Sequence, residues 1–263
     1  LIFAAGGSDT VQTVTTGAVD IASPAAILST IAAYATGAPV RIIAAHMLGS
    51  PDILWYVKTE SPLKSFKDVD GRKLAYSRPG SVTHIALLNL VRQEGLKPEL
   101  ISAGGLPATL TMVMTGQIDV GWSAAPFALD KVRSGELRVL FTGDDIKEIV
   151  NVTGRVVITS EKFLKERRDL ARRFLIAHHR AVEWVYKLQP EAAAKRFAED
   201  NEFDIEVAKA AMKFFSAEKN ALAPVRGLEI SVAQAAEFKM IDKPLTKDQL
   251  AELVDIVYDP EKK

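Results

Sequence analysis

The chain contains one 22-residue pattern twice. Residues 6–27 align with residues 105–126 at a constant offset of 99 positions, and eight of the aligned positions are identical. The identical pairs are Gly6/Gly105, Thr10/Thr109, Val14/Val113, Thr16/Thr115, Gly17/Gly116, Asp20/Asp119, Ala25/Ala124 and Ala26/Ala125. Two copies of one structural unit so far apart in the sequence predict two similar lobes, with a cleft between them.

Length and composition fit a two-lobed globular protein. Hydrophobic cores tend to split beyond roughly 250 residues, and this chain has 263. Its 33 basic and 33 acidic residues cancel, so we expect no nucleic-acid partner, because such binding needs a basic surface. The sequence has no cysteine, which excludes disulfides, thiolate metal sites and cysteine nucleophiles. It also has no apolar run of the ~20 residues that a membrane span requires.

Apolar segments and turn signals alternate along the chain and predict an α/β fold with mainly parallel sheets flanked by helices. Residues 40–45 are apolar apart from one arginine, and three of them are β-branched, as in a strand buried on both faces. In the first repeat we expect a strand at Leu1–Ala5, a helix from Asp9 capped by Ser8, and a strand at 18–22. Leu1–Ala5 resembles a strand entered midway, so we also expect a preceding segment with a first strand and helix.

The lobe boundaries follow from a turn-rich junction near residues 61–71 and from the return of the chain after residue 154. We predict that residues 1–60 and 155–263 form lobe 1 and that residues 61–154 form lobe 2. The last hundred residues read as helical. Their helix starts are predicted at Ser160, Pro190, Asp204 and Thr246.

Loops at the carboxyl ends of strands are the expected ligand positions in such a fold, since helix N-termini present free N–H groups there. The strongest candidate is the segment 79–83, where Gly80 permits close backbone approach and Ser81 and Thr83 offer hydroxyls before an apolar helix. This arrangement suits a carboxylate or sulfonate, although Ser81 could equally be an ordinary N-cap. The full set of candidate binding residues is Gly7, Ser8, Ser23, Pro24, Met47, Arg78, Gly80, Ser81, Val82, Thr83, Trp122, Pro126 and Arg155.

Three of these candidates carry particular expectations. Arg78 and Arg155 are the cations best placed to pair with an anion, unless they are simply solvated. Trp122 would provide an aromatic surface, with Met47, for the apolar part of a ligand. The alternative is a tryptophan packed in the core, as tryptophans usually are.

No catalytic or metal-binding set emerges from the sequence. No Gly-x-Ser-x-Gly motif occurs, and no Ser/His/Asp set can be assembled. Asp20 and Asp119 occupy equivalent repeat positions, which favours a structural role for each in its own lobe. His46 and His84 lie near the cleft loops but have no further metal ligands beside them. We therefore expect no enzyme activity, no cofactor and no metal.

Three motifs together resemble a known family. They are the Gly-x-[Val/Ile]-Asp-[Ile/Val] units at 17–21 and 116–120, the junction 66–74, and Gly80-Ser81 opening a helix. They resemble the substrate-binding proteins of bacterial ABC importers of the nitrate/sulfonate/taurine type, which include thiamin-pyrimidine-precursor binders. The likeness runs from residue 1 to about residue 190.

The resemblance implies a two-lobed periplasmic-binding-protein fold of type II that closes over a small organic anion. Such a protein would be periplasmic and monomeric, and it would deliver its ligand to a membrane permease. The family's contacts would transfer to Gly80, Ser81, Val82, Ser23, Pro24, Trp122 and Pro126. The family's Trp-acid-Pro loop is altered here, because Trp122-Ser123-Ala124-Ala125-Pro126 lacks the acid, and a carboxylate that recognises an amine is not expected.

Two alternatives stay open. One is a thiamin-pyrimidine-precursor binder or synthase on the same fold, although the synthases use a cysteine-rich segment that this chain lacks. The other is a ligand-sensing domain of a transcription regulator, although no DNA-binding helix-turn-helix is visible. The sequence does not name the solute.

Overall fold

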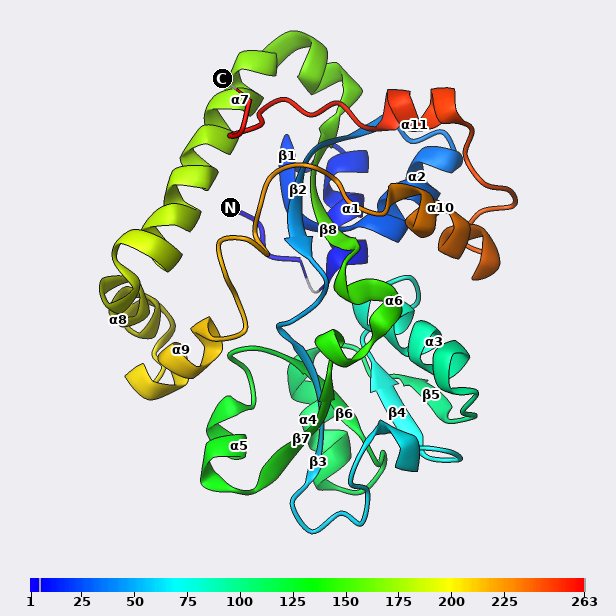
Figure 1. Cartoon of the computed structure of the whole chain (residues 1–263), viewed down its shortest axis with the longest axis vertical. Coiled ribbons are helices and arrows are strands. Elements are labelled where there is room, and N and C mark those ends of the chain that lie inside the picture. The colour runs from blue at the N-terminus through cyan, green and yellow to red at the C-terminus, as the bar shows by residue number, and fades with distance from the viewer. Residues whose placement is uncertain (5, 263) are drawn as a thin grey trace.

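A computed structural model describes residues 1–4 and 6–262. Figure 1 shows two lobes, each built on a sheet with helices packed around it. In lobe 1, β8 (Thr153–Ser160) lies between β1 (Ile21–Ala26) and β2 (Val40–Leu48). The chain after α11 (Lys247–Leu253) runs beside β2 through a parallel bridge from Val254 to Ile42.

In lobe 2, β3 (Ile53–Lys58) lies between β6 (Gly121–Ala124) and β7 (Leu137–Thr142). A second pair of strands, β4 (Lys73–Tyr76) and β5 (Glu99–Ser102), joins this sheet through a parallel bridge between Leu74 and Val120. The predicted α/β class is therefore confirmed.

The predicted strand direction is wrong. β8 runs antiparallel to β1 and β2, and β3 runs antiparallel to β6 and β7, so that β4–β5 is the one parallel ladder among the described residues. The reason lies in the connections: β3 and β8 are the strands by which the chain enters one lobe from the other. Each runs opposite to the two strands that it separates. A continuous apolar run such as that of β2 reports burial on both faces, which a mixed sheet provides as well.

The duplicated pattern folds as a duplicated unit. α1 (Gly7–Thr15) and α4 (Leu106–Met114) each start after a glycine N-cap, end at a threonine C-cap that precedes a left-handed glycine, and lead to β1 and β6. The prediction that Ser8 caps the first helix is wrong, because Gly6 is the N-cap and no side chain caps this helix. The helix simply begins two residues earlier than expected.

The remaining α-helices are α2 (Ile27–Ala35), α3 (Val82–Glu94), α5 (Leu129–Ser134), α6 (Lys147–Val150), α7 (Glu161–Glu183), α8 (Pro190–Asn201), α9 (Ile205–Met212) and α10 (Leu228–Glu237). The predicted helix starts at Ser160, Pro190, Asp204 and Thr246 are confirmed, with side-chain caps at all but the proline. None of the described helices has the length and apolar character needed to cross a membrane.

The first four residues form no strand, and the side chains of Leu1, Ile2 and Phe3 are exposed. The predicted strand at Leu1–Ala5 is thus wrong for residues 1–4, because their backbone pairs with no strand in the described part of the chain, and Ala5 lies outside that part.

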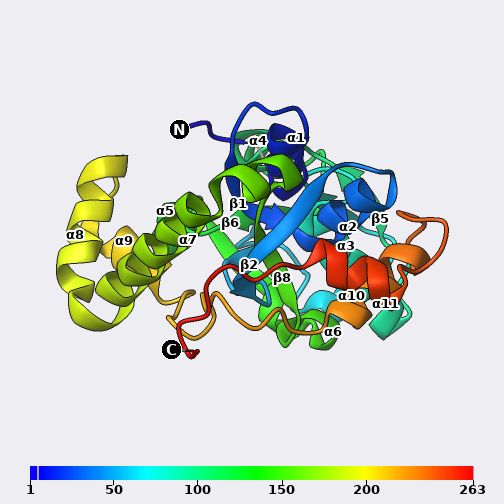
Figure 2. The same ribbon diagram turned by 90° about the horizontal axis from the view of Figure 1, so that it is seen from above.

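Each lobe has its own apolar core. The lobe 2 core contains Leu54, Trp55 and Tyr56 of β3, and the lobe 1 core contains Ile42 and Ile158. Figures 1 and 2 place α8 and α9 to one side of the molecule, at the end of the long α7. Val207 and Ala211 of α9 pack into the lobe 2 core. The predicted lobe boundaries stay a prediction. By those boundaries α8 and α9 belong to lobe 1, yet α9 packs against the core of lobe 2.

Candidate functional site

The two lobes are joined at a hinge made of two crossing segments. Residues 49–52 lead from β2 to β3, and residues 143–152 lead from β7 to β8. A buried ion pair ties the two crossings together, with Arg155 Nη1 lying 2.8 Å from Asp52 Oδ1. Both residues are less than a tenth exposed. Arg155 is therefore a hinge residue whose charge is matched by Asp52 within the protein, and its pairing with a bound anion stays a prediction.

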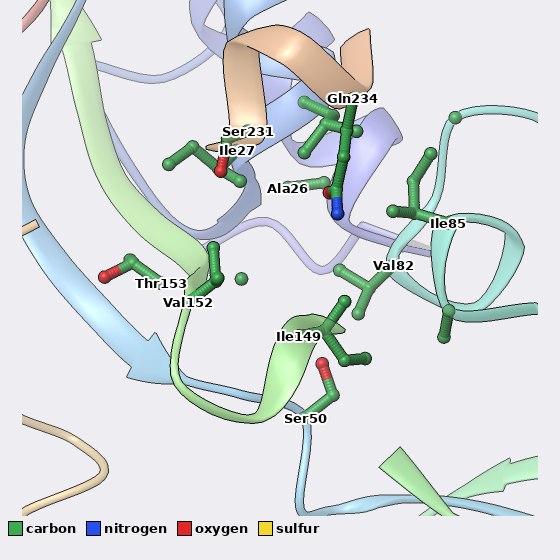
Figure 3. Close-up of a pocket in the computed structure, with 14 residues that line it drawn as sticks. Ala26, Ile27, Ser50, Val82, Ile85, Ile149, Val152, Thr153, Ser231 and Gln234 are labelled. Atoms are coloured by element: carbon green, nitrogen blue, oxygen red, sulfur yellow. The ribbon is translucent and has the colours of Figure 1, made fainter. Parts of the chain in front are cut away.

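A narrow cavity lies beside this hinge, between the lobes (Figure 3). The space that it leaves for a water-sized molecule is about 30 Å³. Its walls come from β1 and α2, the hinge, the loop before α3, α3 itself, α6, β8 and α10. They are Ala26, Ile27, Leu28, Ser50, Gly80, Val82, Ile85, Ala86, Ile149, Val152, Thr153, Gly154, Ser231 and Gln234. The cavity is mostly apolar and takes residues from both lobes.

Two helices begin at the cavity wall. α2 starts at Ile27 after Ala26, which provides no side-chain cap, and α3 starts at Val82 after the N-cap Ser81. The first N–H groups of a helix have no partner within it and carry partial positive charge. One such helix start from each lobe facing one cavity makes this position suited to an anion.

Hydrogen bonds hold the loop before α3 in place. Ser81 Oγ accepts from the His84 N–H at 3.2 Å and lies 2.9 Å from Thr83 Oγ1, which itself accepts from the Ser77 N–H. Ser81 and Thr83 are almost fully buried. Their hydroxyls shape the loop, as the N-cap alternative for Ser81 predicted. The part of this segment that lines the cavity is Gly80 and Val82.

The lobes are in contact at the side of the cleft where α1 begins. Arg78 Nη1, from lobe 2, lies 2.7 Å from Asp9 Oδ1, from lobe 1. Ser29 Oγ donates to the Gly80 carbonyl at 2.9 Å, again from one lobe to the other. Arg78 thus joins the lobes instead of facing the cavity. A wider, open groove runs along this side, and Ser8 lines it together with Gly80.

The other predicted candidates are dispersed. Ser23 Oγ lies 3.0 Å from His46 Nδ1, Pro24 is exposed, and Met47 is buried. Trp122 is 6% exposed and packs in the lobe 2 core, as its alternative reading predicted, and its Nε1 has no partner among the described residues. The last two candidates are Gly7 and Pro126. Gly7 packs so closely on Ala26 that a Cβ added to the glycine would lie 2.9 Å from the Ala26 nitrogen, and Pro126 is partly buried.

The structural role predicted for the repeat aspartates holds for Asp119, whose Oδ2 accepts from the Lys73 N–H at 2.9 Å. At Asp20 the backbone carbonyl, and not the carboxylate, accepts a hydrogen bond, which Thr159 Oγ1 donates. In the described part of the chain, no group of three or more His, Cys, Asp or Glu side chains could hold a metal ion.

Sequence reasoning missed the contribution of the C-terminal helix α10, which brings Ser231 and Gln234 to the cavity. No local motif marks these residues. The one signal available was the polar character of Gln234 on a helix whose neighbours Val232 and Ala235 are apolar.

His46 makes the stability of the fold dependent on pH. Burial, followed by the proximity of His178 and Arg155, lowers its pKa to about 3 from 6.5. Between pH 6.5 and about pH 3 the His46 imidazole binds a proton in the unfolded chain but not in the folded protein. Acidification therefore destabilises the fold by up to about 1.4 kcal/mol per pH unit.

We therefore expect His46→Gln to weaken this dependence, with the free energy of unfolding measured by urea titration at pH 6 and pH 4. His84, whose pKa is also lowered by burial, remains in the variant and contributes equally to both proteins. His178, whose pKa burial lowers as well, lies beside His46, with ring centroids 5.4 Å apart, so its contribution is coupled to that of residue 46. An identical loss of stability in wild type and variant would contradict this assignment.

Comparison with known proteins gives the family and the fold. The NMT1/THI5-like family matches residues 1–193, and because this is well over half of the chain, the protein belongs to that family. No curated protein sequence matches the chain.

Solved structures of similar fold include the periplasmic aliphatic sulphonate binding protein SsuA from Escherichia coli. It is 19% identical with a TM-score of 0.77, and the match covers 98% of this chain and 82% of that one. The alkanesulfonate-binding SsuA from Xanthomonas axonopodis pv. citri, bound to MOPS, is 16% identical with a TM-score of 0.81, covering 97% and 86%. A mutant of DszB in complex with biphenyl-2-sulfinic acid is 16% identical with a TM-score of 0.66, covering 93% and 86%. The chain thus has the fold of periplasmic binding proteins.

Proposed function

We propose that this member of the NMT1/THI5-like family is the extracytoplasmic solute-binding protein of an ABC importer. It takes up a small organic anion of the sulfonate or carboxylate class between its lobes and delivers it, as a monomer, to a membrane permease. The observation that carries the proposal is the cavity at the hinge, onto which one helix N-terminus from each lobe opens. A solute held there would contact both lobes and favour their closure.

The chemistry of the cavity wall supports binding. The apolar side chains of Ile27, Val82 and Ile85 suit the carbon part of an organic anion, and the free N–H groups of two helix starts suit its charge. The sulfonate ligands named for two structures of this fold have that same character. The class of the solute is thus proposed from two things together, the chemistry of the cavity wall and the ligands named for the two similar structures.

An enzymatic function on the same fold is the second candidate, since the DszB structure shares the fold. One observation favours it: Ser23 Oγ and His46 Nδ1 are within hydrogen-bond distance, as a nucleophile and its base would be. Against it, a histidine whose pKa lies at about 3 is a weak base at neutral pH. Turnover of an aryl sulfinate that is lost in His46→Gln would favour the enzyme.

The binding proposal is tested by calorimetry and thermal shift on protein freed of bound solute, with ethanesulfonate, isethionate, taurine and propionate as probes. We expect saturable binding of at least one probe and a rise in melting temperature. Val82→Asp should weaken that binding about 100-fold or more, because two like charges ~5 Å apart repel by about 3 kcal/mol at an effective dielectric constant near 20.

Val82→Asn is the matched uncharged control and should bind much more tightly than Val82→Asp. A carboxylate in the first turn of α3 is favourable for the helix, so the charged variant should still fold. Cooperatively folded wild-type protein that binds none of the four probes would count against the proposed function.

A further inference from the structure

We propose that Gln234 of α10 contacts the bound solute and that its side-chain oxygen selects solutes carrying an N–H or O–H group. This inference rests on the proposed solute-binding function and narrows it. The solute would be a hydroxy- or amino-substituted organic anion.

Gln234 is placed to make such a contact. It is 3% exposed, and Figure 3 shows its side chain extending from α10 with the amide end in the cavity. Its Nε2 donates to Asn89 Oδ1 at 2.9 Å. Asn89 is fully buried on α3, so this hydrogen bond joins a helix of the C-terminal region to the first helix of lobe 2.

The neighbouring bonds decide which way the two amides face. Arg92 Nη2 donates to the same Asn89 Oδ1 at 2.9 Å, and a guanidinium can only donate, so the atom that it meets must be oxygen. Asn89 Nδ2 in turn donates to the Ile85 carbonyl at 3.0 Å. Gln234 must therefore turn its nitrogen toward Asn89, which leaves its Oε1 as the free end of the amide.

That oxygen accepts no hydrogen bond from the residues that the structure describes. A solute that fills the cavity shuts this oxygen off from water, and an acceptor that then lacks a donor costs free energy. The helix starts of α2 and α3 offer donors only, which an anionic group satisfies. Gln234 Oε1 is the complementary element, an acceptor that a hydroxyl or amine on the same solute satisfies.

The single acceptor beside the donors of the helix starts also makes the site selective between solutes. A site that accepts a hydrogen bond from a solute hydroxyl rejects the analogue without it, because the analogue leaves the buried acceptor unpaired. Ethanesulfonate, isethionate and taurine test this directly, since they share one sulfonate and two carbons, and the last two add a hydroxyl or an amine.

The experiment measures the affinity of wild-type protein for these three probes by calorimetry. We expect isethionate or taurine to bind about 5- to 10-fold more tightly than ethanesulfonate, the size that one hydrogen bond gives. In Gln234→Leu this preference should disappear, so that the three probes bind with equal affinity. Ser231→Ala is the matched control, because that hydroxyl lines the same cavity on the same helix but donates to the Gly227 carbonyl, and the preference should survive.

Gln234→Met replaces the leucine variant if the latter does not fold, since it keeps the length of the side chain without the amide. Equal wild-type affinity for the three probes, or a preference that survives in the Gln234 variant, would overturn this inference and leave the proposed function standing. Binding of none of them would overturn both.

Discussion

Replacing Asp52 by leucine should destabilise the protein by about 3–5 kcal/mol, because it leaves the Arg155 guanidinium buried without a counter-charge. The two side chains are less than a tenth exposed and 2.8 Å apart. Asp52 lies on one crossing segment and Arg155 lies in β8 just after the other, so the unpaired charge would lie at the hinge. Urea unfolding monitored by circular dichroism measures the loss.

Two variants give this prediction its control. The double change Asp52→Leu with Arg155→Met should recover much of the lost stability, since a buried ion pair replaced by apolar groups is often close to neutral. Asp200→Ala, which breaks the exposed pair with Arg196 on α8, should have only a small effect. If Asp52→Leu were no more damaging than Asp200→Ala, the pair would have no part in holding the hinge.

The large-scale architecture was predictable because it depends on local signals. The repeated Gly-flanked helix and strand predicted two similar units, and both are present as α1–β1 and α4–β6. Cap residues such as Ser160 and the Thr246–Gln249 box fix helix starts through bonds to the next three residues. These preferences act within a few positions of the chain, and the sequence displays them directly.

Contacts across long sequence separations were not predictable in the same way. The sequence alone does not show that Arg155 is paired, because its partner Asp52 lies 103 positions away. Gln234 gains its position from Asn89, 145 positions away. Trp122 was expected at the cleft, but its strand presents it to the lobe 2 core. Strand direction failed for a related reason, because the pairing of β3 and β8 is set by where the chain crosses between lobes.

The hinge offers a second test with a large effect, because its two segments touch at Gly143. A Cβ added there would lie 2.1 Å from the Ser50 carbonyl oxygen and 2.9 Å from its carbonyl carbon. Contacts under 3.0 Å with backbone atoms cannot be relieved by turning a side chain. The crossing segments would have to separate, and a substitution that overpacks the interior typically costs about 1–3 kcal/mol.

We expect Gly143→Ala to destabilise the fold by about 3 kcal/mol, the upper end of that range, in the same urea titration. Gly105→Ala is the matched control, since its nearest neighbour would be Pro107 Cδ at 3.8 Å and its φ of −77° suits any residue. It should cost less than about 1 kcal/mol. Because the added methyl at residue 143 pushes the crossing segments apart, the variant should also bind the sulfonate probes more weakly. Equal stability of the two alanine variants would show that the segments do not pack as described.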